Sequence, residues 1–437
     1  MQPRTFWIAI LTLAAPAVLA AQERLALDDA IARARSKHPS VVTAGIAERE
    51  AALKVDEARA AYYPRVDAVE SWQRGNLPVF AFSSLLSQRR FTAQDFDIST
   101  LNSPDPLDNF RAALSVEQVI FDGAIVPSIR AAKLGREAAA LRRQQTEQDL
   151  ATATVDAYGR VLLFEALAGA ARAGVEAAVE DARRARDRYE VGTATQADVL
   201  SIDVHAASMR ERDIQARTEA QIARARLNEL IGAPLDAQFA LETLPPVVRA
   251  IEPVPALEAQ ALDARPDVRL STLEQRTAEA AIAAARSAFL PQLAFRGGWE
   301  WNGGTFGTRE GGWLVGTEVR WNVFRGFGNR ARLKGAEAAL ERHGQERQRV
   351  ETAARLDVRA AAARLDAAQA RREVAQAVVS QALESRRITR DRYEQGLADA
   401  AALLQAAQAV LDAEAQEIAA RVDALVRRAA LDRAVGR

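Results

Sequence analysis

Four short segments of the chain alternate between apolar and polar residues, the pattern typical of β-strands with one apolar and one polar side. The clearest runs from Trp313 to Phe324, with the larger apolar side chains at its odd-numbered positions: Trp313, Val315, Thr317, Val319, Trp321 and Val323. Residues 292–301, 110–121 and 65–74 repeat the pattern, and the last is the weakest because Glu70 falls on its apolar side. Strands of about ten residues with aromatic ends are typical of bacterial proteins that cross the outer membrane as β-structure.

Alanine, glutamate and arginine fill most of the remaining chain, and these residues favour helices. In each half, the pattern predicts a first helix, a very long helix and a return helix: 40–62, 124–190 and 196–231, then 267–289, 329–394 and 400–435. The first long stretch has about 67 residues, which as a helix span ~100 Å. Any one strand also fits an antiparallel sheet on a soluble core, but helices of this length beside the strands favour a membrane sheet.

Prolines and glycines mark the changes between helix and strand. Pro64 and Pro291 end the two first helices, because proline disfavours the helical conformation of the residue before it. Gly123 and Gly326 begin the two long helices. We expect all four residues at junctions between a β-barrel and its helices. Residues 326–331 also read G-x-G-x-x-A, a pattern found in nucleotide sites, but the alternating strand before them favours a simple bend.

The chain is internally duplicated. RDRYEVG at 186–192 returns as RDRYEQG at 390–396, and ARAAYYP at 58–64 returns as ARSAFLP at 285–291. The first copy is longer because it holds an insertion at about 76–109, rich in turn-forming residues. The sequence therefore predicts a signal peptide, a first repeat, a proline-rich linker and a second repeat: 1–20, 21–232, 233–255 and 256–437. The expected fold class is mainly α with membrane β.

The number of strands predicts self-association. Four strands per chain are too few to close a barrel, for which about eight is the practical minimum. Unpaired strand edges are not tolerated in lipid. A dimer supplies eight strands and a trimer twelve, and the count alone does not choose between them.

Composition narrows the function. The apolar run from Phe6 to Ala20 follows Arg4 and is too short to span a bilayer, so it favours a cleaved secretory signal. Lys+Arg and Asp+Glu are both 58, and this balance argues against a nucleic-acid partner. There is no cysteine, and the three histidines lack metal-ligand spacing. We expect neither an enzyme nor a metal or cofactor site.

The most specific motif is Tyr189-Glu190-Val191-Gly192-Thr193, followed by Asp198-Val199-Leu200. This Y-x-V-G-T-x-x-x-x-D-V-L turn, within the duplicated plan, resembles the outer membrane efflux protein family of TolC-like channels. The resemblance implies a homotrimer with a 12-stranded barrel in outer membrane lipid and a long α-helical barrel in the periplasm. It also implies docking to a periplasmic adaptor (membrane fusion) protein and an inner-membrane pump of RND or ABC type, with a tip that opens like an iris.

The two predicted tips differ. Ala402 stands where the second repeat would match Asp198, and Ala398 stands where the resemblance places a locking arginine. Gly192 and Gly396 reverse the chain, since glycine accepts the left-handed conformation of such a turn. Our hypothesis is that four side chains line or brace the periplasmic gate, while Thr193 and Leu397 face the adaptor: Tyr189, Asp198, Tyr393 and Asp399. The alternative for Asp198 is that it only caps its helix.

Three classes of function fit these patterns. The first is the export channel, as one part of a tripartite efflux or type I secretion system. The second is a periplasmic coiled-coil adaptor or structural protein, and the third is a secreted surface coiled coil. Only the channel needs detergent to remain soluble as a trimer. The cargo stays open among drugs, metal ions, small metabolites and polypeptides.

Overall fold

The computed structural model describes residues 23–192, 195–242 and 252–437. The expected signal peptide, Thr193 and residues 243–251 of the expected linker lie outside these residues. The chain forms two compact units. One comprises residues 40–148, 252–361 and 432–437, and the other comprises 1–39, 149–251 and 362–431. Each repeat therefore contributes to both units.

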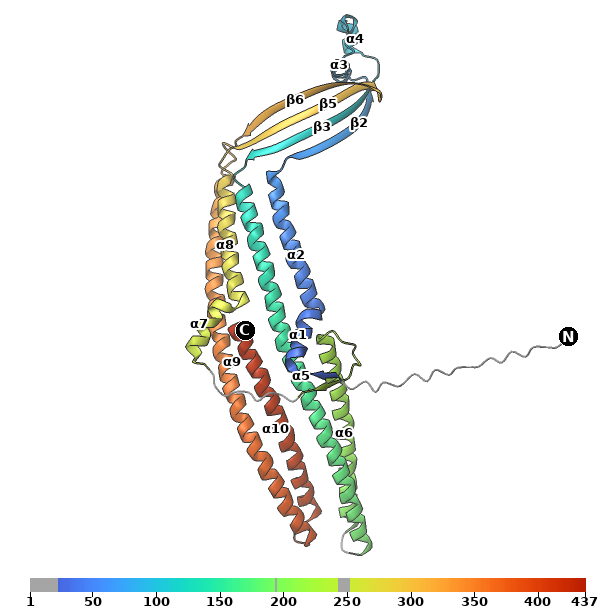
Figure 1. Ribbon diagram of the computed structural model, residues 1–437, viewed down its shortest axis with the longest axis vertical. Coiled ribbons are helices and arrows are strands. Elements are labelled where there is room, and N and C mark those ends of the chain that lie inside the picture. Colours follow the sequence, from blue (N-terminus) through green and yellow to red (C-terminus); the bar gives the residue numbers. More distant parts are fainter. Residues whose placement is uncertain (1–22, 193–194, 243–251) are drawn as a thin grey trace, which may run out of the picture. The chain divides into compact units, whose positions relative to one another are not determined.

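A four-stranded antiparallel sheet lies in the first of these units (Figure 1). Its strands, in spatial order, are β2 (Arg65–Gly75), β3 (Leu107–Phe121), β5 (Gln292–Thr305) and β6 (Thr308–Arg320). The first repeat supplies β2 and β3, and the second supplies β5 and β6. In the described part of the chain β2 and β6 do not pair with each other, so the sheet has two open edges.

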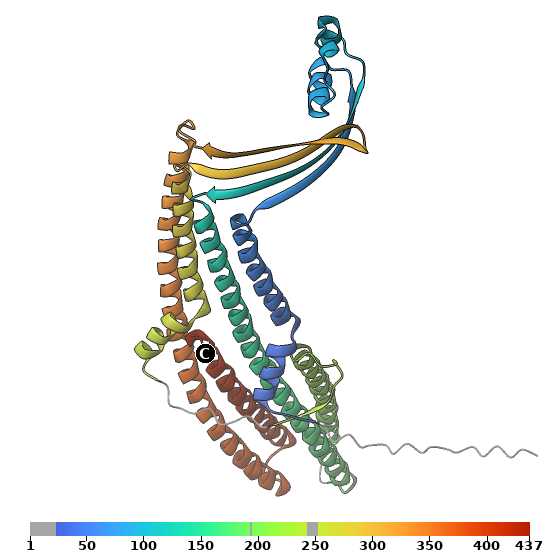
Figure 2. The same cartoon turned by 45° about the horizontal axis from the view of Figure 1, so that its top comes forward.

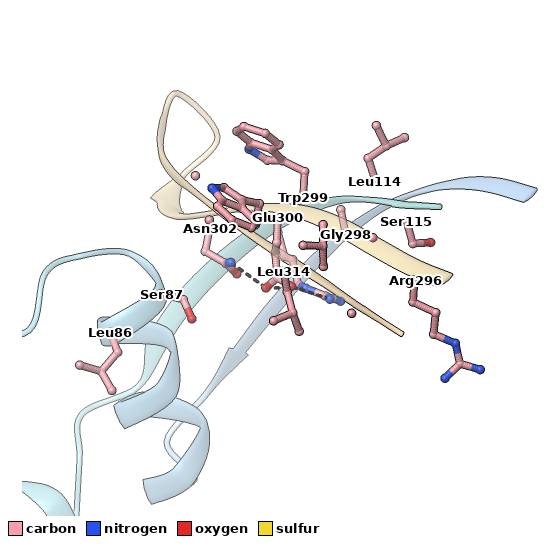
Figure 3. A pocket seen from close by; sticks show the side chains of 18 of the residues that line it. Leu86, Ser87, Leu114, Ser115, Arg296, Gly298, Trp299, Glu300, Asn302 and Leu314 are labelled. Atoms are coloured by element: carbon pink, nitrogen blue, oxygen red, sulfur yellow. Dashed lines mark hydrogen bonds and ion pairs between the residues drawn. The ribbon is translucent and has the colours of Figure 1, made fainter. Parts of the chain in front are cut away.

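The register of the sheet brings the expected apolar sides onto one face. Trp72 pairs with Phe110, Leu114 with Trp299, and Trp299 with Trp313. Figure 3 shows Trp299 and Leu114 projecting from one side of the sheet and Arg296 and Leu314 from the other. Glu70, the exception on the apolar face, forms an ion pair with Arg309.

The last strand begins and ends earlier than its pattern predicts. We expected it at 313–324, and β6 spans Thr308–Arg320. Trp321 is not part of the strand, and its indole N–H donates to the carbonyl of Phe289 over 3.0 Å. This bond ties the residue after the strand to the end of the preceding helix.

The same unit also contains helices, and the long ones extend from one end of the sheet (Figure 1). They are α2 (Pro39–Arg59), α7 (Val254–Ala264), α8 (Pro266–Ser287) and the first parts of α5 (Ile125–Glu190) and α9 (Gly328–Glu394). The predicted bounds of the long helices agree with α5 and α9 to within one residue. Gly326 has a positive φ (φ 55), a left-handed conformation that glycine adopts without strain. Leu134, Ala138 and Leu141 of α5 pack with Leu273 of α8, which joins the two repeats in one core.

The insertion at 76–109 contains helices that the sequence did not predict. They are α3 (Pro78–Ser87), a 3₁₀ turn η2 (Ala93–Phe96) and α4 (Ile98–Asn102). Pro78 stands in the first turn of α3, where proline is tolerated because the first N–H groups have no helical partner. Gln88, buried after α3, donates to the side chain of Asn109 in β3 over 3.0 Å. The insertion is thereby held to the polar face of the sheet.

The second unit contains the two helical turns. It comprises α1 (Leu27–Lys37), the second parts of α5 and α9, and the return helices α6 (Gln196–Leu230) and α10 (Ala400–Val435). Figures 1 and 2 show α6 running back along α5 and α10 running back along α9. Among the described residues, no helix combines the length and the apolar character needed to span a membrane.

Part of the expected linker lies against the helices. β4 (Phe239–Leu241) pairs in parallel with β1 (Glu23–Leu25), and Phe239 and Leu241 pack on a core that includes the buried Tyr158. The Tyr158 hydroxyl lies 2.8 Å from the carbonyl oxygen of Leu25 and 2.9 Å from that of Glu242. Burial raises the pKa of Tyr158 to about 12, so the hydroxyl keeps its proton and can donate to either carbonyl.

Candidate functional site at the helix turns

The second turn is closed by its own backbone. Helix α9 ends at Glu394, and Gly396 follows with a positive φ (φ 75). The N–H of Gly396 donates to the carbonyl of Tyr393 over 3.1 Å, and the N–H of Leu397 donates to that of Arg392 over 2.8 Å. These two bonds are a Schellman motif, which satisfies the last carbonyls of a helix. The turn is therefore built on the left-handed glycine that the sequence predicts.

The first turn has a glycine in the same conformation. Gly192 also has a positive φ (φ 76), and its N–H donates to the carbonyl of Tyr189 over 3.0 Å. Helix α6 then starts with a capping box, in which Thr195 and Asp198 each accept a bond from the other's backbone N–H. These bonds measure 3.2 Å to the Thr195 hydroxyl and 3.0 Å to the Asp198 carboxylate. The Thr195 backbone N–H is the main cause that lowers the pKa of Asp198, followed by the Thr195 hydroxyl.

Asp399 starts the second return helix in a different way. Its carboxylate accepts a bond from the backbone N–H of Ala402 over 2.8 Å. Asp399 is the repeat counterpart of Thr195, and Ala402 is the counterpart of Asp198. In α10 the carboxylate of Asp399 alone therefore caps the helix, whereas in α6 the hydroxyl of Thr195 and the carboxylate of Asp198 share this role. Asp198 and Asp399, the two acids of the gate hypothesis, each accept a hydrogen bond from a backbone N–H at the start of a helix. This is the capping role that was the alternative for Asp198.

The two tyrosines have different surroundings. Tyr393 packs against the buried residues Ala182 and Ala185 of α5 and Ile202 of α6. The Arg188 guanidinium carbon lies 4.8 Å from the centre of the Tyr393 ring, within the range of a cation–π contact. Tyr189 at the equivalent place is 48% exposed. Tyr393 therefore joins the two repeats at the turns, whereas Tyr189 does not.

The turns also carry residues that sequence reasoning missed. Arg188 belongs to the repeated RDRY motif, and this repetition could have indicated that the residue matters at the turn. No feature of the sequence indicated that Arg188 contacts Tyr393 of the other repeat. Arg186 in α5 forms an ion pair with Asp203 in α6 at 2.5 Å, closing the first hairpin. Leu397 is 70% exposed beyond the second turn, where a partner can reach it.

The sequence pattern of the outer membrane efflux protein family matches residues 30–233 and 257–437 of this chain. The chain belongs to this family. As a member it is a protein of the cell outer membrane whose helical part extends into the periplasm. Members of the family are channels and not enzymes.

One similar sequence is the pyoverdine export outer membrane protein OpmQ of Pseudomonas aeruginosa, 28% identical over 190 residues. That match covers 43% of this chain and 40% of the relative, which is less than half the length of either.

Solved structures with the same fold include two outer membrane proteins. The outer membrane channel CmeC of Campylobacter jejuni matches with TM-score 0.80 and 18% identity, covering 94% of this chain and 85% of that chain. The outer membrane protein VceC of Vibrio cholerae matches with TM-score 0.76 and 19% identity, covering 94% and 96%.

Proposed function

We propose that three copies of this chain close into one barrel and form a passive export duct across the outer membrane and periplasm. The main observation behind the proposal is that the chain belongs to an outer membrane family and that its four-stranded sheet is not closed. Strands β2 and β6 leave two unpaired edges, and lipid does not tolerate unpaired backbone groups. Three chains with four strands each supply a closed barrel of twelve.

The two faces of the sheet suit this arrangement. Apolar side chains on one face are exposed in the single chain, among them Trp72 at 60%, Trp313 at 66% and Val319 at 68%. Lipid would cover these side chains in the barrel. On the other face Arg111 pairs with Glu300 at 2.8 Å, and Arg296 pairs with Glu117 and Glu318. This polar face suits a water-filled lumen. Because its charges are paired with one another, they would bind passing solutes only weakly.

The helix turns are the proposed periplasmic gate, which opens like an iris. Three-fold symmetry would bring three copies of Asp198 around one axis, and a ring of carboxylates on a narrow pore attracts cations. Asp399 adds a second acid to each chain at the start of α10. Tyr393 braces the turns through its contacts with the first hairpin, and the exposed Tyr189 would line the gate. The absent locking arginine, replaced by Ala398, means that a lock of this gate would use other residues.

We further propose that the turns dock to a periplasmic adaptor, which links the duct to an inner-membrane pump of RND or ABC type. The exposed Leu397 and Val191 at the two turns offer apolar contacts for such a partner. The name of OpmQ assigns pyoverdine export to that relative, and it supports a small-molecule cargo among the classes that remain open here.

The mass of the purified protein in detergent tests the assembly. The protein component should have three times the mass of one mature chain by light scattering with detergent correction. Removing detergent should precipitate it, because the apolar face of the sheet then meets water. A stable monomer, or a chain that stays soluble without detergent, would overturn the proposal and favour the periplasmic adaptor class.

A further inference from the structure

A groove lies where the first helices meet the sheet. At this end of the sheet α2 and the 3₁₀ turn η1 (Ala60–Tyr62) lead into β2, and β3 leads into α5 (Figure 1). The groove has a volume of about 460 Å³. Its lining includes two tyrosines, a valine and three cations: Tyr62, Tyr63, Val126, Arg59, Arg130 and Lys133. The proposed gate and lumen use none of these residues.

The groove presents aromatic and aliphatic side chains to its surroundings. Tyr62, Tyr63 and Val126 are exposed by 53%, 71% and 64%. The same end of the sheet carries further exposed aromatic residues, among them Trp321 and Phe327. Aromatic residues are enriched at the boundary between membrane and water. This end of the sheet therefore has the side chains of a membrane interface.

Two of the three cations in the groove have no acidic partner in the described part of the chain. Arg59 forms an ion pair with Asp56 of its own helix at 3.3 Å. Arg130 and Lys133 form none among the described residues, and both are exposed. They are three positions apart on α5 and so lie on one face of the helix. The first turn of α5 also contains no acid. The groove therefore has two positive charges that nothing described in the chain neutralises.

The position of these two cations along α5 fits the headgroup layer of a membrane. The helices of this outer membrane family extend into the periplasm, so the junction meets the periplasmic leaflet. Arg130 comes five residues after Ile125, the first residue of α5, or ~8 Å along the helix. One headgroup layer is ~5–8 Å thick. Helical side chains lean toward the N-terminus, and long cationic ones extend readily to an interface. Arg130 and Lys133 therefore reach back toward the lipid.

We propose that the groove binds an anionic phospholipid of the periplasmic leaflet, with Arg130 and Lys133 contacting its phosphate. Tyr62 and Tyr63 pack beside the start of its acyl chains. The occupant is a lipid and not a free phosphate, because exposed aromatic and aliphatic side chains adjoin the cations. This inference rests on the proposed insertion of the sheet in lipid, and it adds a site that fixes the depth of the chain in the membrane.

Native mass spectrometry of the detergent-solubilised full chain tests the site. The protein is incubated with phosphatidylglycerol, which is anionic, or with phosphatidylcholine of the same acyl chains, which is zwitterionic, and the bound lipid is titrated. The test variant is Arg130→Gln with Lys133→Gln. The matched control, Arg142→Gln with Arg355→Gln, removes two exposed cations further along the long helices. A second control, Arg130→Lys with Lys133→Arg, keeps both charges in the groove.

The natural protein and both controls should bind phosphatidylglycerol more tightly than phosphatidylcholine. The test variant should bind phosphatidylglycerol roughly 25-fold more weakly, since each cation near anionic lipid changes the affinity by about fivefold, and phosphatidylcholine as before. The lipid site is wrong if the natural protein binds both lipids equally, if the test variant keeps its preference, or if glycerol phosphate displaces the lipid. A trimeric mass in the same spectra then leaves the proposed function standing. A monomer that stays soluble without detergent would remove both.

Discussion

At the scale of single residues, the two return helices are capped at their N-termini by different side chains. Thr195 and Asp198 share the cap of α6, and Asp399 alone caps α10. An oxygen at the cap position satisfies N–H groups that have no helical partner. The missing acid at Ala402 is therefore explained by local chemistry, without reference to a gate.

We expect Asp198→Ala to reduce the cation preference of the channel, because each substitution removes one carboxylate from the proposed ring at the turn. Ion selectivity in a planar bilayer under a salt gradient measures it. Thr195→Ala is the control for capping, since it weakens the helix start by ~1 kcal/mol and keeps the charge. Asp213→Ala is the control for charge, because it removes one carboxylate further along α6. Equal selectivity of all three variants and the natural protein would leave Asp198 only its capping role.

The lowered pKa of Asp198 gives this prediction a pH dependence. A carboxyl whose folded-state pKa is depressed binds its proton less tightly in the folded chain than in the unfolded one. The stability that it contributes is therefore complete above its ordinary value of 3.8 and is lost as the pH falls below that value. Cation preference that depends on Asp198 should persist on acidification to about pH 4. Its loss near pH 6 would point to a different group.

At the scale of helices and strands, the sequence predicts what local chemistry determines. The alanine-rich pattern, with a glycine after each long helix, placed α5, α9, α6 and α10 within one or two residues of their bounds. The pair β1 and β4 has no such signal, because each strand has three residues and its partner is distant in sequence. The start of β6 was missed because Gly311 and Gly312 resemble a loop. A Cβ at Gly311 would lie 3.3 Å from the indole nitrogens of Trp299 and Trp301, which explains the glycine.

We expect Gly192→Ala and Gly396→Ala each to destabilise the protein by ~1 kcal/mol, since a side chain resists the left-handed conformation. Thermal unfolding followed by far-ultraviolet circular dichroism measures the effect. Gly135→Ala in α5 and Gly344→Ala in α9 are the matched controls. Both lie in helix interiors with open space around them, and alanine there should stabilise by ~0.5–1 kcal/mol. Unfolding midpoints that rise for all four variants would contradict the assigned turn conformations.

At the scale of the whole molecule, the duplication explains why the chain is incomplete alone. In the described part of the chain, the strands of the two repeats together form a sheet with two open edges. The strand count predicted self-association, but it did not choose between two and three copies, because closure depends on strand tilt and stagger in the assembly. The cargo is also undetermined by these features, since the charges on the polar face of the sheet are largely paired among themselves.

The central claim is that the assembled protein is a duct, and ion current through a single assembly tests it most directly. Purified protein is added to a planar lipid bilayer, and the current is recorded at fixed voltage. The account predicts discrete current steps of uniform size, each from one inserted trimer. Protein that inserts stably into the same lipid, as shown by co-flotation with vesicles and resistance to alkaline extraction, and gives no current steps would contradict it.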